Sequence, residues 1–210
     1  MKRQNWILII LLACVGVTLI SSCSTKQAPP NEEQRQEARL QVPCIVVLPV
    51  VTDLKADETM TYNKASVLEE GAAVLDQAIA EALMGHDNVR LLSKRQLTSL
   101  LPESETAQAA LYTKIGKELN CNAVLKTTLS RYQQRVGGDY GVDSPASAMF
   151  FMELANTADG SLIWSSTFRE TQQSLMSNIL SAHKYGLKWL KVEELVTMGV
   201  TEIVEQCPYL

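Results

Sequence analysis

Histidine is scarce in this 210-residue sequence, and the short spacings that usually hold metals are missing. The two histidines, His86 and His183, lie far apart, and none of the five cysteines forms a CxxC pair. Zinc sites usually draw their ligands from such closely spaced pairs. We therefore predict no bound metal.

The sequence also lacks a catalytic motif. His86 precedes Asp87 in a turn after a predicted helix, but no serine or cysteine nucleophile is identifiable beside the pair. A solvated turn is the favoured interpretation. The glycine-rich segment 137–141 opens no helix and lacks the lysine of a phosphate-binding loop. We predict a protein that is not an enzyme and uses no cofactor.

Basic residues are in the minority. The chain has 19 basic and 23 acidic residues, which gives a formal net charge of −4. Loss of the first 22 residues would remove Lys2 and Arg3, and the remaining 17 basic residues would leave a charge of −6. An acidic protein is a poor match for nucleic acid or for an anionic lipid surface, so neither is predicted as the main partner.

Only one long apolar run occurs, and it lies at the N-terminus. Residues 6–20 follow Lys2 and Arg3, and this run is too short to span about 30 Å of hydrocarbon comfortably. A cationic start, an apolar stretch and small residues before a cleavage point are typical of a secretory signal. The stretch ends at Ile20, Ser21 and Ser22, directly before Cys23.

This arrangement resembles a bacterial lipoprotein precursor, whose new N-terminal cysteine is acylated. The resemblance implies that residues 1–22 are a signal peptide and that lipid on Cys23 anchors the protein to a membrane. Residue 24 is serine and not aspartate, which by resemblance to Gram-negative lipoproteins favours the outer membrane, with the protein facing the periplasm. The alternative is a chance cysteine in an uncleaved anchor.

Residues 23–43 are predicted to be the lipidated cysteine and a flexible tether. The segment 24–43 is polar and contains two adjacent prolines, Pro29 and Pro30. Fully extended, it would reach about 70 Å. The rest of the chain, residues 44–210, is long enough for a single periplasmic domain with a real core.

Three cysteines remain in this predicted domain. Cys44 and Cys121 each stand at the start of a predicted strand, and Cys207 lies near the C-terminus. If the two strands are parallel neighbours, Cys44 and Cys121 could form a disulfide in the oxidising periplasm. The alternative is three buried, reduced thiols.

The apolar pattern predicts alternating strands and helices. A continuous apolar run at residues 44–50 indicates a strand buried on both faces. Helical spacing behind a capping box at Ser66 indicates a helix over about 66–83, with a stop at Gly85. Further strands are predicted at 89–92, 123–136, 147–156 and 162–172, and further helices at 93–102, 106–119, 174–183 and 192–205.

This order of elements predicts an α/β fold, of the α+β two-layer sandwich type, with a mixed sheet of about five strands. Right-handed crossovers are expected to place the helices together on one face of the sheet. The other face then needs cover, either from the C-terminal helical extension at residues 174–210 or from a partner.

Four segments in this order share one pattern: Ile45-Val-Val-Leu-Pro49, Lys94-Arg-Gln-Leu97 with Leu100-Leu101, Ile115-Gly-Lys-Glu-Leu119 leading to Ala123-Val-Leu125, and Met152 to Gly160 followed by Ile163-Trp164. Together they resemble the periplasmic α/β domain shared by the curli-secretion lipoprotein family, the amino-terminal domain of TolB and the lipoprotein activators of penicillin-binding proteins. The resemblance covers roughly residues 44–172.

We expect a non-catalytic accessory or assembly factor of the cell envelope that binds another envelope protein. The alternative is an oligomeric secretion-channel or scaffold subunit similar to the curli-secretion lipoprotein, so a homo-oligomer stays open. The segment 126–156 is short and carries Arg131, Arg135 and Asp139, which disfavours long membrane hairpins. The expected contact surfaces are an open sheet edge and a loop containing Gly137, Gly138, Asp139 and Tyr140.

Overall fold

The computed structural model describes residues 28–54, 62–100, 108–138, 141–172 and 189–210. Several predicted features lie outside these ranges: Ile20, Ser21, Ser22, Cys23, Asp139, Tyr140 and the predicted helix at 174–183. In the part of the chain that is described, no helix combines the length and the apolar character that a membrane crossing requires.

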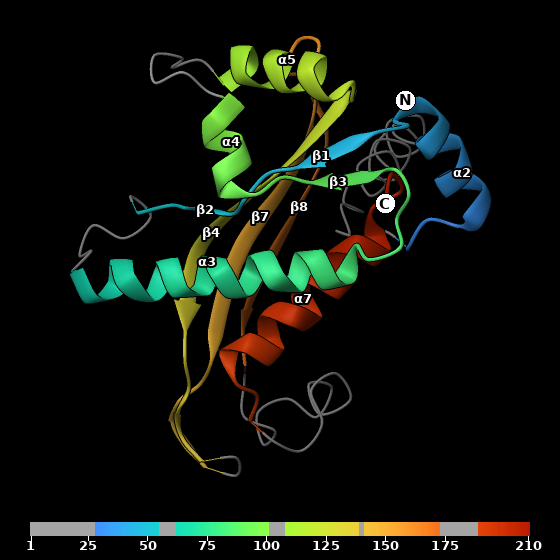
Figure 1. Ribbon diagram of the computed structural model, residues 1–210. Helices are drawn as coiled ribbons and strands as arrows, with labels where there is room; N and C mark the ends of the chain where they lie inside the picture. The colour runs from blue at the N-terminus through green and yellow to red at the C-terminus, as the bar shows by residue number, and fades with distance from the viewer. Residues whose placement is uncertain (1–27, 55–61, 101–107, 139–140, 173–188) are drawn as a thin grey trace, which may run out of the picture.

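The centre of the molecule is a mixed sheet, as the strand pattern predicts (Figure 1). Its spatial order is β3-β1-β4-β7-β8, and β2 pairs with β4 beyond the end of β1. The β3, β1 and β4 strands are parallel, whereas β4, β7 and β8 form antiparallel pairs. The strands are β1 (Ile45–Val47), β2 (Val51–Thr52), β3 (Val89–Leu91), β4 (Ala123–Gln133), β7 (Ser147–Asn156) and β8 (Leu162–Thr171).

Helices connect or flank these strands, and a separate two-stranded hairpin lies between β4 and β7. The turn between β7 and β8 contains Gly160 at φ +73°, as expected for the Asp-Gly turn in the sequence. The helices are α2 (Glu32–Gln41), α3 (Tyr62–Ala82), α4 (Lys94–Leu100), α5 (Gln108–Leu119) and α7 (Val192–Gln206), and the hairpin strands are β5 (Val136–Gly137) and β6 (Val142–Ser144).

One face of the sheet, here called the closed face, is covered by α3 and α7, which lie side by side in Figure 1. Alternate strand residues point into this layer, including Ile45, Leu125 and Phe150, and all three are almost completely buried. The α7 helix approaches the sheet closely at Gly199, where an alanine Cβ would come within 2.7 Å of the Phe168 ring. This layer is the main hydrophobic core.

The opposite face, here called the open face, is covered in part by α4 and α5. Val46 and Val124 point to this side and pack with Tyr112 and Ile115 of α5. The expectation that the helices lie together on one face is therefore wrong. The chain steps from β1 to the edge strand β3 and then back across β1 to β4. Right-handed crossovers in opposite directions place their helices on opposite faces of a sheet.

The α2 helix corrects the predicted tether. Residues 32–41 are helical, and Asn31 begins the helix with a capping box in which its side chain accepts from the Gln34 N–H at 2.8 Å. Arg35 donates to the carbonyl oxygens of Glu205, Cys207 and Leu210, beyond or within the last turn of α7. The N-terminal segment is thus held against the folded body from Asn31 onward.

Candidate functional site

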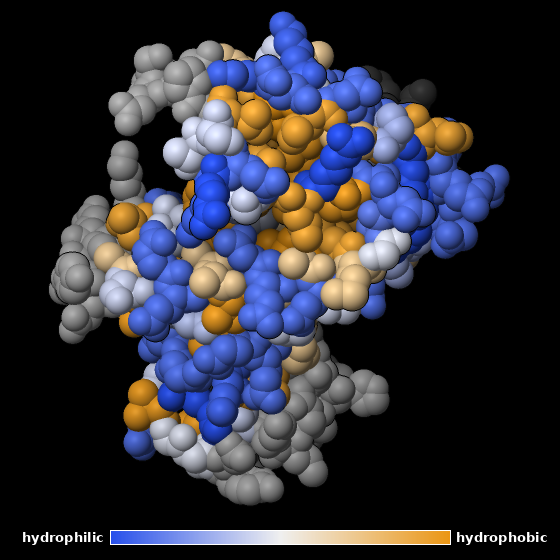
Figure 2. All heavy atoms as spheres, viewed as in Figure 1, coloured by the Kyte–Doolittle hydropathy of each residue, from blue (hydrophilic) through white to orange (hydrophobic). Residues whose placement is uncertain are grey.

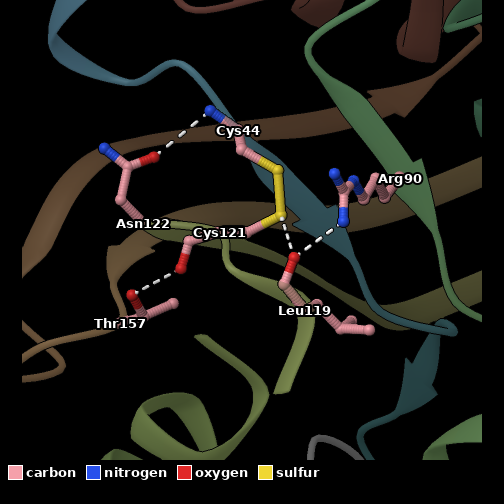
Figure 3. Close-up of a disulfide and its surroundings, with 6 residues drawn as sticks. All are labelled: Cys44, Arg90, Leu119, Cys121, Asn122 and Thr157. Atoms are coloured by element: carbon pink, nitrogen blue, oxygen red, sulfur yellow. Dashed lines mark hydrogen bonds between the residues drawn. A yellow bond between two sulfur atoms is a disulfide. The ribbon is translucent and has the colours of Figure 1, made fainter. Parts of the chain in front are cut away.

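The predicted cysteine pair, Cys44 and Cys121, is joined by a disulfide just before the starts of β1 and β4 (Figure 3). The two Cα atoms are 4.8 Å apart. The neighbouring Asn122 side chain accepts from the Cys44 N–H at 3.2 Å, and the Cys121 carbonyl accepts from the Thr157 hydroxyl at 3.0 Å. The disulfide therefore joins the two segments that lead into the adjacent parallel strands β1 and β4. Side-chain hydrogen bonds also hold these segments in place.

The remaining thiol, Cys207, is buried behind the end of α7. Burial is the main cause that raises the pKa of its thiol to about 11, although Arg35 acts in the opposite direction. A thiol with this pKa is almost entirely protonated at neutral pH, and the thiolate is the reactive form. Burial and the raised pKa of Cys207 both favour a packing role for this residue.

The turn at His86 and Asp87 borders a small cavity of about 230 Å³, which Arg39, Gly85 and Asn88 also line. Burial lowers the pKa of His86, and the nearby Arg39 and Arg35 lower it further. None of these lining residues carries a hydroxyl or a thiol. Within the described ranges, no three histidine, cysteine or acidic side chains are grouped as a metal site would need.

The predicted contact loop is carried by the β5–β6 hairpin. Gly137 has φ +118°, and any Cβ there would come within 2.6 Å of the Gly141 carbonyl oxygen, so the turn requires glycine. Gly138 donates its N–H to that same carbonyl at 2.8 Å. Val136, at 56% exposure, and Asp143 are exposed beside this turn.

The hairpin and the α2 helix lie at opposite ends of α7. At its first turn, the Val192 N–H donates to the Gln134 side chain at 3.1 Å, and Gln134 also donates to Glu193. At the other end of α7 stands Arg35 of α2. Since α7 is about 22 Å long, the loop projects well away from the point where the N-terminal segment joins the body (Figure 1).

A further surface, which the sequence reasoning missed, lies where β3, α4 and α5 meet. Figure 2 shows apolar atoms gathered on the visible face between α4 and α5, with hydrophilic side chains around them. Leu91 is 52% exposed, and the other leucines here are only partly buried. We call this surface the β3-edge patch. Leu92, Leu97, Leu111 and Leu119 pack on the open-face cluster, and Leu91, which pairs with Val47, adjoins them at the edge of the sheet on the α3 side and is counted with them.

A cavity of about 510 Å³ lies at one end of the β3-edge patch, between α3 and the start of α4. Leu91, Leu92 and Ile79 supply apolar walls, while Asp76 and Lys94 also line it. The Asp76 carboxylate accepts from the Val50 N–H at 2.8 Å. Burial raises the pKa of Asp76, partly offset by this hydrogen bond and by Lys94. The cavity opens at the carboxyl ends of β1 and β3, where α/β sheets commonly bind ligands.

The elements that carry the patch are rich in basic side chains. Arg90 of β3 is exposed and donates to the Leu119 carbonyl at 2.7 Å, so it spans the gap between β3 and the end of α5. The only acidic side chain in the three elements is Glu118. Their basic side chains are Arg90, Lys94, Arg95, Lys114 and Lys117.

The sheet also has a long edge on the other side. The β8 strand runs for ten residues and pairs with β7 alone among the described strands. Leu162, Thr167 and Arg169 are exposed along it. It is therefore an edge to which an extended segment could add.

Comparisons with known proteins give similarity of structure and none of sequence. No protein-family model and no curated protein matches the chain. The PelC dodecamer from Paraburkholderia phytofirmans is 13% identical with a TM-score of 0.43, covering 78% of this chain and 85% of that one. Lipoprotein GNA1162 from Neisseria meningitidis is 16% identical with a TM-score of 0.35, covering 77% and 96%.

The C-terminal domain of LpoB from Escherichia coli is also similar, at 14% identity and a TM-score of 0.34 over 66% of this chain and 96% of that one. LpoB belongs to the penicillin-binding-protein activators, one of the lipoprotein groups that the four sequence segments resemble. At such scores none of these similarities assigns a role to a residue of this chain.

Proposed function

We propose that the protein is a lipid-anchored lipoprotein of the bacterial outer membrane that binds another envelope protein and has no catalytic role. The signal-like N-terminus with Cys23 supports the anchor. In the described part of the chain, neither the disulfide nor the cavity at His86 combines a nucleophile with a base. Binding is the function that the remaining surface features support.

The observation that carries this proposal is the β3-edge patch. Five leucines from three elements are left partly or largely exposed beside a cavity. Scattered single leucines are normal on a protein surface, whereas contiguous apolar patches mark interaction sites. The cavity would take one large apolar side chain of the partner, in the manner of a buried interface anchor.

A membrane anchor would allow the protein to bind its partner through an interface of modest affinity. Lipid on Cys23 would confine the protein to the membrane surface, and the segment before α2 would limit how far it moves. Tethering of this kind raises the effective concentration of a site relative to a membrane-proximal partner. The loop with Gly137, Gly138, Asp139 and Tyr140 is proposed as a secondary contact, because the described strands that flank it, β5 and β6, follow Gln134 at the end of α7 that is remote from α2.

The test is site-specific photo-crosslinking in cells that express the full lipidated chain. A photoreactive residue replaces Leu91 in the patch, and Leu40 on α2, which is 83% exposed, serves as the control position. We expect position 91 to capture one envelope protein reproducibly and position 40 to capture none. Only self-crosslinked ladders from position 91 would contradict the proposal and favour the oligomeric channel or scaffold alternative.

The anchor has a separate test. Cells are labelled with a clickable palmitate analogue, and the chain is recovered from separated membranes. We expect label and outer-membrane sedimentation for the natural chain and loss of both for Cys23→Ser. Retention of the label in Cys23→Ser would rule out this anchor, whatever the crosslinking result.

A further inference from the structure

We propose that the β3-edge patch binds an amphipathic helix of another envelope protein, with leucine-like residues on its apolar side and acidic residues flanking them. This inference rests on the proposed function and specifies the chemistry of the partner. It follows from three features of the patch: the short edge strand, the cavity and the basic rim.

The short edge strand favours a helix over an extended segment. An added strand would gain its affinity from main-chain hydrogen bonds, and β3 offers only three residues. The apolar side chains, by contrast, come from β3, α4 and α5 together. A surface of this kind suits the i, i+3, i+4 and i+7 side chains of a helix laid into a groove. The cavity beside Leu91 supplies the place for one anchoring side chain.

Charge favours an acidic helix. The β3, α4 and α5 elements carry five cations and one carboxylate, although the chain as a whole is acidic. The neighbouring α3 helix has the opposite balance, since Lys64 is accompanied by Glu69, Glu70, Asp76 and Glu81. The elements that carry the patch are therefore basic, although Lys117 lines the pocket beside the disulfide and Asp76 of α3 lines the cavity next to Lys94. Complementary charge would steer an acidic helix to the patch and reject a basic one.

A symmetric dimer through this surface is disfavoured by the same charges. In a two-fold dimer the same patch occurs on both sides of the interface. The basic rims would then face each other, and like-charge contacts across an interface are costly. A second copy is accordingly treated as an outcome that would overturn the inference.

The experiment measures peptide binding to the full lipidated chain in lipid nanodiscs by fluorescence anisotropy. The probe is a helix of about 14 residues, or roughly four turns, with leucines at i, i+3, i+4 and i+7 and glutamates flanking them. Its matched control keeps every leucine and replaces each glutamate by lysine. We expect the glutamate peptide to bind at least about tenfold more tightly, with an affinity that falls as salt rises.

Variants locate the binding. We expect Leu91→Ser to weaken the glutamate peptide about tenfold, as for an interface anchor. We expect Lys94→Glu to weaken the glutamate peptide and to strengthen the lysine peptide. On the opposite edge, Leu162→Ser and Arg169→Glu are matched exposed controls that should change neither affinity. Circular dichroism verifies that each variant is folded, and substitutions of exposed side chains usually change stability by less than about 0.5 kcal/mol.

Three results would overturn the inference: equal binding of the two peptides, an equal loss in Leu162→Ser, or self-association of the chain that Leu91→Ser abolishes. Any of them could occur while photo-crosslinking from position 91 still captured an envelope protein. The proposed function would then stand without this partner chemistry. Absence of any captured partner would instead refute the proposed function itself.

Discussion

The two faces of the sheet are built from the same strands, yet helices cover them to different extents. On the closed face, α3 and α7 cover a core in which Phe150, Leu75 and Leu195 have no measurable exposure. On the open face, α4 and α5 cover Val46 and Val124 but leave four leucines of the β3-edge patch partly exposed, namely Leu92, Leu97, Leu111 and Leu119. The closed face buries more apolar surface and should contribute more to stability, whereas the open face keeps apolar surface exposed.

The largest effect should come from truncating the centre of the closed face. The Phe150 ring stacks on Phe168 with ring centroids 5.1 Å apart, so Phe150→Ala should lower the free energy of unfolding by about 3–5 kcal/mol. Leu97→Ala on the open face should cost about 1 kcal/mol. Urea unfolding followed by circular dichroism measures both. Equal losses of unfolding free energy in the two variants would show that the two faces contribute equally to stability.

The disulfide reinforces the weaker face, because Cys121 packs with the α5 cluster there. Its two cysteines are separated by 77 positions in the chain, so the double variant Cys44→Ser, Cys121→Ser should be less stable by about 2–4 kcal/mol. Reductant should destabilise the natural chain by a similar amount and leave the double variant unchanged. If reductant also destabilised the double variant, a different disulfide would have to be present.

Arg35 links the N-terminal segment to the closed face through three carbonyl oxygens. Arg35→Ala should lower the free energy of unfolding by about 1–2 kcal/mol, since it removes charge-assisted hydrogen bonds at the end of a helix. Hydrogen exchange should become faster in residues 32–41. The neighbouring exposed residue Gln36 provides the control, and an equal change in Gln36→Ala would argue against the contact.

The smallest expected change in stability comes from Asp76 of α3, which lines the cavity between α3 on the closed face and α4 on the open face. Because burial raises its pKa, the folded protein holds this proton more tightly than the unfolded chain does. Its favourable contribution is therefore present in acid and is lost as the pH rises through the raised pKa. Asp76→Asn should be slightly more stable than the natural chain at pH 7. The difference should vanish below the ordinary aspartate pKa of 3.8, as urea midpoints across pH can show.

Much of the fold could be predicted from local patterns. The strand at 147–156 was predicted with the bounds that β7 has, and the predicted strand at 162–172 differs from β8 by one residue. Alternating or continuous apolar residues suffice for such elements because one face of each strand must be buried. The mixed sheet follows from the order of these elements, and most residues of both hydrophobic clusters lie in the predicted strands and helices.

Some local signals were misinterpreted. Residues 32–41 are polar and were assigned to a flexible tether, although glutamate, glutamine and arginine are good helix formers and Asn31 with Gln34 forms a capping box. The α3 helix begins at Tyr62, before the predicted cap at Ser66, because no proline or glycine between them ends a helix. A cap signal marks a permitted start and cannot exclude an earlier one.

Other features depend on spatial order, which the sequence pattern does not contain. The helices occupy both faces because β3 and β4 flank β1 on opposite sides, and the order of elements along the chain leaves that choice open. The β3-edge patch was missed for a related reason. Leu97 and Leu111 mark amphipathic helices whether or not another layer covers them, so periodicity alone cannot reveal exposure.

Under the proposed anchoring at Cys23, the docking of α2 would set how far the folded domain can move from the membrane. For a chain held at Cys23, only residues 24–31 remain between the lipid and the clamped helix, and these extend to at most about 28 Å. A tether that continued to residue 43 would extend to about 70 Å. Since the accessible volume scales with the cube of this radius, Arg35 and the α2 cap reduce it about fifteenfold. If lipid on Cys23 anchors the chain, as proposed, a partner would have to present its binding segment close to the membrane surface.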